Sequence, residues 1–494
     1  MSIVKRTLSS AYTLVAGNLV QRLLGVVSMI ILARILTPED FGIVAVATLA
    51  VFFLETMTTL GAKEYVAKVE QIDDDIVNTA WTLNFCIKMA CWICFFFLAD
   101  EIAFFLNKPE VADSLRVLSF ILPITCFGNP GMMIYRRELN YKPQFKVMVI
   151  SKLVSFPFVI GYAVLYESHW AMIYGTIINY AVPAILSYYY SSHRPRFCFK
   201  NVRLQWRFSK WIVANGVLGY SKSQVDSIIV SKYFSLDTVG IYGMFKNLAM
   251  MPISLIIQPA TEPLLASFSR VKTEGGILPY QINASILLSS AFVIPLVTMM
   301  ILFHHDIILM ILGEKWTENS IVFAALSPML ISFTMVRVIS QLIIAKDKIS
   351  SLFYFDLLMF FVATIILVAY ANDDVENFAL VRSLTSIISM ITFIIFIARK
   401  HININFYVVM LFGLPVVSAF LPGVSLSELN IFSSSYSPFF NLIINCSLFM
   451  VCYIMLMLLL LYPFRRRHEV SLLTDAGVSL ISGTIKSLKK VNQK

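Results

Sequence analysis

The chain is a succession of apolar runs, each about as long as a bilayer is thick. This feature limits the fold more than any motif does. A transmembrane helix needs roughly 20 apolar residues, and such runs recur throughout the 494-residue sequence, separated by short polar segments. The chain is 58% hydrophobic and only 14% charged, whereas a soluble domain is roughly 45–50% apolar and 25% charged. Because a soluble fold could not bury this excess, the sequence predicts an all-α integral membrane protein.

The apolar runs predict about 14 transmembrane helices. The least regular run, at 115–134, is interrupted by Pro123, Pro130, Gly128 and Gly131. In order along the chain, the predicted spans are 11–33, 41–62, 78–98, 115–134, 147–166, 169–191, 211–231, 238–266, 280–303, 321–345, 350–371, 377–398, 406–422 and 439–463.

The positions of the basic residues test this helix count independently. Lys and Arg accumulate in cytoplasmic loops, so a correct count should alternate basic and neutral loops. With the N-terminus inside, 27 of the 39 Lys and Arg residues fall in inside segments and 5 in outside segments. Both termini are therefore predicted to be cytoplasmic. The net charge of +10 follows from this distribution, and no single basic face indicates nucleic-acid binding.

A sequence pattern near the first predicted helix hairpin recurs 198 residues later. Ala33–Ile43 reads ARILTPEDFGI and aligns with SKYFSLDTVGI at Ser231–Ile241. Both copies contain a basic residue, two apolar residues, a hydroxyl residue, an acid and then Gly-Ile. Both follow an odd-numbered span, so they face the same side of the membrane and indicate a parallel repeat. Parallel repeats of transporter halves place the substrate site between two lobes.

The repeat and the loop lengths predict the division of the chain into domains. The longest clear connection is strongly basic and separates the sixth and seventh spans. The predicted parts are an N-lobe of helices 1–6 at 1–191, a cytoplasmic basic linker at 192–210, a C-lobe of helices 7–12 at 211–400, helices 13 and 14 at 401–464, and a basic cytoplasmic tail at 465–494.

Eleven ionisable residues fall inside the predicted spans, apart from Arg116, which lies at the outer end of the span at 115–134 and is counted with the outside residues. A charge at the centre of a transmembrane helix costs about 2.5–3.5 kcal/mol on insertion scales, so these residues should face a wet cavity, pair with one another, or lie near the interface. Seven are basic and four acidic, which leaves a positive excess that suits an anionic ligand such as a pyrophosphate or a uronic acid. They are Arg22, Glu55, Lys88, Lys152, Lys222, Asp226, Lys246, Glu262, Arg337, Asp356 and Arg382.

Two motifs resemble a known family. They are RILTPEDFG at Arg34–Gly42 and the helix that ends in Thr58-Thr-Leu-Gly61. They resemble the polysaccharide exporters of the multidrug/oligosaccharidyl-lipid/polysaccharide superfamily, namely the Wzx-type flippases and particularly the colanic-acid-exporter-like branch. The resemblance also covers the span count, the arrangement of six, six and two helices, and the repeat. It implies two six-helix lobes around a central cavity, as in the related multidrug exporters, with spans one and seven lining that cavity.

The candidate site residues combine the charge argument with this resemblance. Arg22 and Lys222, on the repeat-related spans, and Arg337 are expected to give the cavity its positive charge. Asp226 lies one helical turn after Lys222, so the two share a face. Asp226 and Glu55 are the candidate coupling groups or charge partners, with Glu55 placed as a partner of Arg22. No cofactor and no metal site is predicted, and proton or sodium coupling stays open.

The predicted function is transport. The resemblance implies a flippase that moves undecaprenyl-pyrophosphate-linked oligosaccharide repeat units across the bacterial inner membrane by alternating access, for O-antigen, capsule or exopolysaccharide biosynthesis. Its expected partners are the lipid-linked oligosaccharide, membrane lipids and other polysaccharide-assembly membrane proteins. The sequence carries no phosphate-binding loop of the nucleotide-hydrolysing type, and the chain is not expected to be an enzyme.

Two alternatives remain open at this point. A multidrug or organic-ion antiporter of the same fold would need an acidic site for organic cations, against the observed basic excess. A membrane-embedded polysaccharide polymerase or ligase typically carries catalytic residues on a long periplasmic loop. The longest outside loops here, near 306–320 and 423–438, are short.

Overall fold

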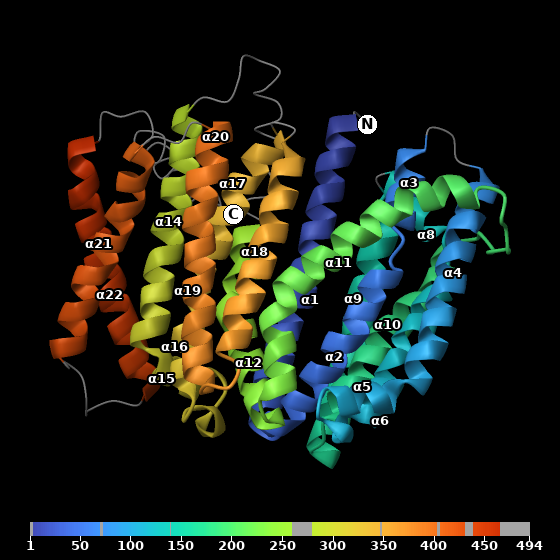
Figure 1. The fold of residues 1–494 in the computed structure, drawn as a ribbon, viewed down its shortest axis with the longest axis horizontal. Coiled ribbons are helices and arrows are strands. Elements are labelled where there is room, and N and C mark those ends of the chain that lie inside the picture. Colours follow the sequence, from blue (N-terminus) through green and yellow to red (C-terminus); the bar gives the residue numbers. More distant parts are fainter. Residues whose placement is uncertain are drawn as a thin grey trace, which may run out of the picture. The chain divides into compact units, whose positions relative to one another are not determined.

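A computed structural model shows an all-helical chain over the residues it describes, which are 3–69, 73–138, 140–258, 279–345, 348–402, 406–429 and 438–464. In this part of the chain, 11 helices are long and apolar enough to cross a membrane (Figure 1). Large apolar side chains lie on their outer surfaces, and Leu165 and Ile365 are 76% and 71% exposed. Such exposure is unfavourable in water and expected against lipid. The predicted class, an all-α multi-pass membrane protein, is confirmed.

Three of the 14 predicted spans are not among these 11 helices. The span at 115–134 is divided into α6 (Ala112–Ser119), α7 (Ile121–Cys126) and α8 (Met132–Arg137). Its prolines and glycines explain the breaks, because proline lacks a backbone N–H and glycine weakens a helix. The segment is therefore a broken helix and not the continuous helix that was predicted.

The other two predicted spans are helical. The span at 211–231 lies within α11 (Val202–Tyr233), where Lys222 and Asp226 interrupt the apolar sequence. The span at 406–422 lies within α21 (Phe406–Leu429), of which Gly413–Ser425 forms a shorter apolar helix. The eighth predicted span extends past residue 258, beyond the described part of the chain, and so does the predicted tail at 465–494.

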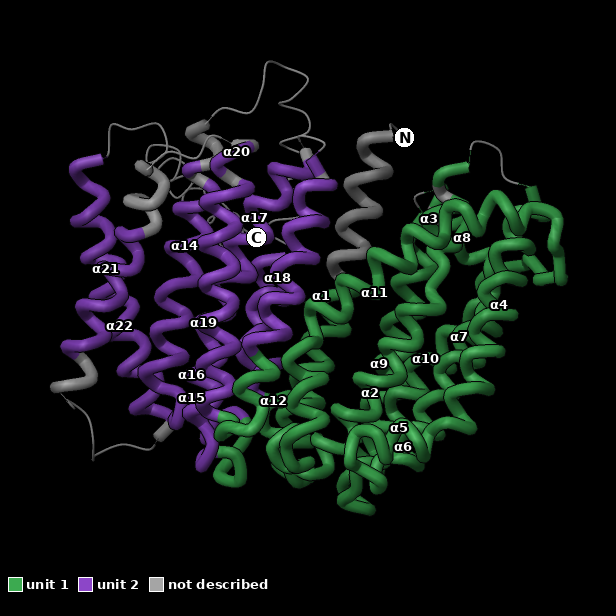
Figure 2. The backbone as a smooth tube through the Cα atoms, viewed as in Figure 1, with its two compact units in different colours: residues 1–244, 312–316, 367–375 green, residues 245–311, 317–366, 376–494 purple. Residues whose placement is uncertain are grey.

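The chain divides into two compact units, which Figure 2 shows in two colours. The first unit comprises Met1–Met244, Leu312–Trp316 and Leu367–Val375, and the second comprises Phe245–Ile311, Thr317–Ile366 and Glu376–Lys494. These units follow from packing within each part of the chain. The predicted N-lobe and C-lobe are defined by pseudo-symmetry, and that division stays a prediction.

The first unit is built mainly from long helices that pack side by side. The α1 helix packs along α9, α9 packs along α10, and α11 packs along α2 and also contacts α3 and α4. Besides α6, α7, α8 and α11, its helices are α1 (Ile3–Ile35), α2 (Pro38–Thr58), α3 (Ala62–Lys68), α4 (Asp74–Phe97), α5 (Ala99–Phe105), η1 (Pro109–Val111), α9 (Lys142–Tyr166), α10 (Trp170–Tyr190), the start of α12 (Leu236–Pro252) and η3 (Glu314–Trp316).

The second unit has two apolar clusters, one around α17 and one around α22. Buried residues of α14, α17, α18 and α19 form the first cluster, and α14, α21 and α22 form the second. Besides α21, its helices are η2 (Ile253–Ile257), α14 (Pro279–Leu302), α15 (His304–Ile311), α16 (Ser320–Leu326), α17 (Met329–Ala345), α18 (Ile349–Ala369), α19 (Val375–Phe393), η4 (Ile394–Ala398), α20 (Arg399–Ile402), α22 (Pro438–Leu461) and η5 (Tyr462–Phe464).

Within the first unit, the basic connections lie at one end of the helix bundle. Figure 1 shows α3, α8 and the segment that joins α10 to α11 at this end, with α5 and α6 at the opposite end. Lys63, Lys68, Arg137 and Arg194 lie on these connections. This arrangement agrees with the alternation of loops used in the charge count.

Candidate functional site

The turn between α1 and α2 shows why its sequence reads Thr-Pro-Glu-Asp-Phe-Gly. Thr37 is the N-cap of α2, and Pro38 occupies the first turn, where its missing N–H costs nothing. The backbone N–H of Thr37 donates to the Asp40 carboxylate at 3.0 Å, and the Asp40 N–H donates to Thr37 Oγ1 at 3.3 Å. Asp40 also accepts the backbone N–H of His169 at 3.1 Å. This reciprocal capping fixes the start of α2.

The second copy of the repeat forms the turn between α11 and α12, where Ser235 stands in place of Thr37. Ser235 Oγ accepts the backbone N–H of Thr238 at 3.3 Å and lies 2.9 Å from Thr238 Oγ1. The aspartate of this copy, Asp237, stands one position earlier than Asp40 does in the first. The cap is therefore simpler in the second copy.

The two turns contact each other through their glycines. A Cβ added to Gly42 would lie 1.9 Å from the carbonyl oxygen of Leu236, and one added to Gly240 would lie 1.9 Å from that of Pro38. Each contact is the counterpart of the other under the 198-residue offset. We call this pair of turns the glycine junction. Only glycine permits backbones to approach so closely, and this explains the Gly-Ile that both copies share.

The predicted site residues of the first unit lie on α1, α2 and α11. Arg22 and Lys222 are half-buried, while Asp226 is fully buried. Tyr242 Oη donates a hydrogen bond of 2.7 Å to the Asp226 carboxylate, so α12 orients this group. Lys222 and Asp226 both lie on α11, one turn apart, as the spacing predicted.

Glu55 belongs to a polar cluster that sequence reasoning did not anticipate. Its carboxylate is hydrogen-bonded to Tyr180 of α10 and lies within electrostatic range of Lys88 of α4. Lys88 is only 5% exposed, and its Nζ donates to Thr125 Oγ1 at 2.9 Å. Four helices thus meet at one buried charged group. Tyr180 and Thr125 gave no signal in the sequence, because single polar residues on apolar helices are common. The pairing of Glu55 with Arg22 stays a prediction.

Arg337 lies on α17 in the second unit. Its side chain is half-buried, and its Nε is buried without a hydrogen-bond partner among the described residues. A buried guanidinium N–H of this kind can donate to an anion. Since Arg22 and Lys222 belong to the first unit and Arg337 to the second, a cavity shared by all three stays a prediction.

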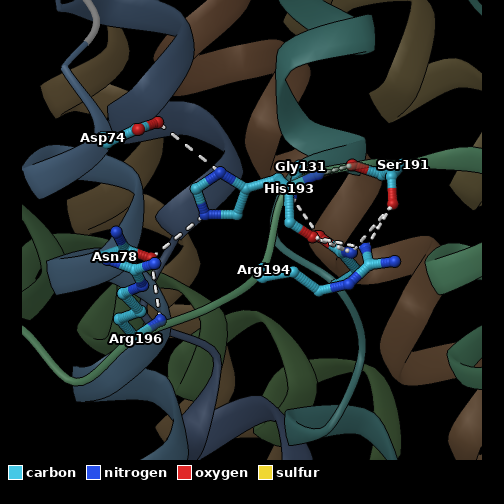
Figure 3. Close-up of polar contacts among 8 residues, drawn as sticks. Asp74, Asn78, Gly131, Ser191, His193, Arg194 and Arg196 are labelled. Atoms are coloured by element: carbon cyan, nitrogen blue, oxygen red, sulfur yellow. Dashed lines mark hydrogen bonds and ion pairs between the residues drawn. The ribbon is translucent and has the colours of Figure 1, made fainter.

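A second polar network fixes the segment between α10 and α11 to the first unit. Figure 3 shows His193 between α4 residues, with Nε2 3.1 Å from Asn78 Oδ1 and Nδ1 3.6 Å from Asp74 Oδ1. Asn129 donates to the carbonyl of His193 at 2.7 Å and accepts the N–H of Gly131 at 2.9 Å. We call residues 191–200, with these partners, the linker anchor.

The anchor continues along α4 to the start of α11. The N–H of Arg196 donates to Asn78 Oδ1 at 3.1 Å, and that of Cys198 donates to Thr82 Oγ1 at 3.0 Å. Lys200 Nζ donates to Asp75 at 2.5 Å, and this hydrogen bond raises the pKa of Lys200 above its ordinary value. The sequence predicted a basic linker at 192–210, and the structure shows that its second half, from Val202, is already helical.

The helices, their apolar surfaces and the charged groups within them define a polytopic membrane protein with polar clusters inside its bundle. The chain belongs to the polysaccharide biosynthesis protein family, whose profile matches residues 31–321, more than half of the sequence. The family resemblance drawn from the Arg34–Gly42 motif is therefore confirmed.

Two curated relatives illustrate this membership. The lipopolysaccharide biosynthesis protein WzxC of Escherichia coli (strain K12) is 22% identical over 400 residues, which cover 79% of this chain and 81% of the relative. The succinoglycan biosynthesis transport protein ExoT of Rhizobium meliloti (strain 1021) is 23% identical over 292 residues, 59% of each chain. The chain is thus related to transport proteins of polysaccharide biosynthesis and not to enzymes.

Solved structures show the same fold. The lipid II flippase MurJ, in an inward closed conformation, matches with a TM-score of 0.75 and 13% identity over 91% of this chain and 99% of MurJ. An inward-facing multidrug resistance transporter of the MATE family matches with a TM-score of 0.60 and 12% identity over 78% of this chain and 94% of the transporter. At such identities the likeness is one of fold alone.

Proposed function

We propose that the chain is a flippase that moves undecaprenyl-pyrophosphate-linked oligosaccharide repeat units from the cytoplasmic to the periplasmic leaflet of the bacterial inner membrane. The observation that carries the proposal is the family membership of residues 31–321 together with a fold shared with a lipid II flippase over 91% of the chain. The names of the relatives, which refer to lipopolysaccharide and succinoglycan biosynthesis, support a glycan as the transported group.

In this proposal the two lobes alternate access to a central cavity, and Arg22, Lys222 and Arg337 supply its positive charge. A pyrophosphate carries concentrated negative charge, and it can cross the low-dielectric core only where cations replace its water. The buried Arg337 Nε, which has no hydrogen-bond partner in the described part of the chain, supports an anionic ligand for this residue.

Asp226 and Glu55 are the proposed coupling or pairing groups. Asp226 is buried and accepts a hydrogen bond from Tyr242, and Glu55 lies by Lys88 and Tyr180. If either carboxylate took up a proton or a sodium ion, its negative charge would no longer neutralise a nearby cation. Such a change in charge can bias one conformation over another.

The likeness to a multidrug transporter keeps an organic-ion antiporter as a second candidate. The two candidates differ in the sign of charge that their cavity must present. An exporter of organic cations should lose transport when carboxylates are removed and should tolerate the loss of Arg22. A flippase of anionic lipids should respond in the opposite way.

The test is export of surface glycan from cells that lack the protein and carry single variants. Deletion should leave lipid-linked glycan facing the cytoplasm. Arg22→Ala, Lys222→Ala and Arg337→Ala should each reduce export at least tenfold, and Arg22→Lys should retain more export than Arg22→Ala if the role is electrostatic. Lys142→Ala removes an exposed cation and serves as the matched control.

Membrane abundance must be measured for every variant, because removing a half-buried charge can leave its partner unpaired. If all three alanine variants insert normally and export glycan at the parental rate, the cationic cavity is wrong. If deletion causes no accumulation of lipid-linked glycan, the flippase assignment itself is wrong.

A further inference from the structure

The first unit contains an open groove at its basic end, formed by α3, the start of α4 and the first turns of α11. Its volume is about 740 Å³. Apolar side chains form most of its wall, among them Tyr65, Ile76, Phe208 and Ile212, and its two charged residues are Lys68 and Arg207. None of the described residues that line it is acidic.

The groove has a defined shape because α3 is fixed against α11. Gly61 begins α3 with a φ of 63°, and a Cβ at this position would lie 2.2 Å from Ile212 Cδ1. The Tyr65 and Phe208 rings are 5.6 Å apart, and Lys68 Nζ lies 5.4 Å from the centre of the Phe208 ring. Arg137 donates to the carbonyl of Val66 at 3.2 Å and so holds the end of α3.

The start of α11 presents the chemistry of a membrane interface. Leu204, Trp206 and Trp211 are 66%, 47% and 66% exposed. They alternate with the exposed bases Arg203, Arg207 and Lys210. Tryptophan is enriched at the level of lipid headgroups, where its ring meets apolar chains and its N–H meets water. Exposed indoles flanked by cations therefore indicate contact with anionic lipid rather than with water alone.

The acidic residues at the start of α4 do not cancel this positive charge. Asp74 lies 3.6 Å from His193, and Asp75 accepts from Lys200 at 2.5 Å. Asp73 is within electrostatic range of Lys200 as well. None of these three carboxylates lines the groove, so Lys68 and Arg207 are its charged groups.

We propose that this groove is a binding site for an anionic phospholipid of the bilayer. Lys68 and Arg207 bind the phosphate, and an acyl chain lies along the apolar wall toward Trp211. The bound lipid fixes the start of α11 at the membrane surface. None of the residues that line the groove is among the proposed substrate-binding residues, and the site does not depend on which glycan the protein carries.

The test is quenching of Trp211 fluorescence by brominated lipids in vesicles that contain the purified full chain. The contribution of Trp211 is the difference between the parental protein and Trp211→Phe. Brominated phosphatidylglycerol, diluted into unbrominated phosphatidylcholine, should quench Trp211 more strongly than brominated phosphatidylcholine at the same fraction. Lys68→Gln and Arg207→Gln should each weaken the preference about fivefold, the effect of one basic residue at a membrane surface.

The matched control is Lys142→Gln with Lys146→Gln, which removes two exposed bases outside the groove and should keep the preference. Equal quenching of Trp211 by both lipids, or an unchanged preference in the Lys68→Gln and Arg207→Gln double variant, would overturn the proposal. So would displacement of brominated phosphatidylglycerol by an equimolar amount of undecaprenyl pyrophosphate, because the groove would then belong to the transported lipid. If the double variant does not fold, Lys68→Gln alone, on the exposed end of α3, decides the outcome.

Discussion

The glycine junction and the linker anchor stabilise two connections of the first unit in different ways. At the junction, the backbones of two helical turns touch at Gly42 and Gly240, so that one added carbon would meet a carbonyl oxygen at 1.9 Å. At the anchor, side chains fix an extended segment by hydrogen bonds. Asn129 donates to the His193 carbonyl, and Asn78 and Thr82 accept the backbone N–H groups of Arg196 and Cys198. The junction depends on the absence of side chains, and the anchor depends on their presence.

This difference predicts different responses to mutation. Steric overlap with a backbone cannot be relieved by a side-chain rotation, so the junction should tolerate no addition. Hydrogen bonds at the partly exposed anchor can be replaced in part by water. The anchor should therefore loosen locally before the unit unfolds.

The largest effect is expected from Gly42→Ala and Gly240→Ala. Either methyl group must separate the two turns, at a cost of about 1–3 kcal/mol or more. Thermal unfolding of the purified protein should occur at a lower temperature in both variants. Gly161→Ala is the matched control, because a Cβ on this helical glycine would meet nothing within 4 Å. Alanine there should stabilise the helix by up to about 1 kcal/mol. If Gly42→Ala raised the unfolding temperature as Gly161→Ala is expected to do, the close contact at Gly42 would be contradicted.

A more local effect is expected from Asn129→Ala. This residue is 4% exposed, and its removal takes one of two donors from the His193 carbonyl and leaves the Gly131 N–H without its acceptor, a loss of about 1–3 kcal/mol. Hydrogen exchange should accelerate in residues 191–198, while exchange in α9 and α10 should stay close to parental. Asn140→Ala, at an exposed position, is the control and should leave the exchange rates of residues 191–198, α9 and α10 unchanged. Uniform acceleration throughout the unit would show that the anchor is part of one cooperative core.

The smallest expected effect is a difference in stability between variants of the helix caps in the two copies of the repeat. Thr37→Ala removes one half of a reciprocal cap and should cost about 1 kcal/mol. Ser235→Ala removes the 3.3 Å hydrogen bond from the Thr238 N–H and the 2.9 Å contact with Thr238 Oγ1, neither of which involves a charged group, and should cost less. Chemical denaturation of the two variants in the same detergent measures the difference. Equal losses would mean that the Asp40 contacts add nothing to the first cap.

The sequence determined the features that depend on local composition. Runs of apolar residues predicted the helices, because a backbone in lipid must satisfy its own hydrogen bonds. Thr37, Asp40 and Gly42 predicted a turn, since capping is a local event. The same motif, with Gly61, supported the family assignment that residues 31–321 confirm. The spacing of Lys222 and Asp226 also predicted correctly that they share one face of a helix.

The features that the sequence missed depend on contacts between distant segments. Glu55, Lys88 and Tyr180 lie on three different helices and interact with one another in the fold. Their spacing along the chain does not predict this interaction.

The break at 115–134 was visible as prolines and glycines, yet only packing decided that three short helices form there. The two copies of the repeat could also be recognised in the sequence, but the contact between them could not. Hydrophobic burial specifies which residues avoid water without specifying which partner covers them. Sequence periodicity therefore defined the helices, and tertiary packing decided which polar groups meet inside the bundle.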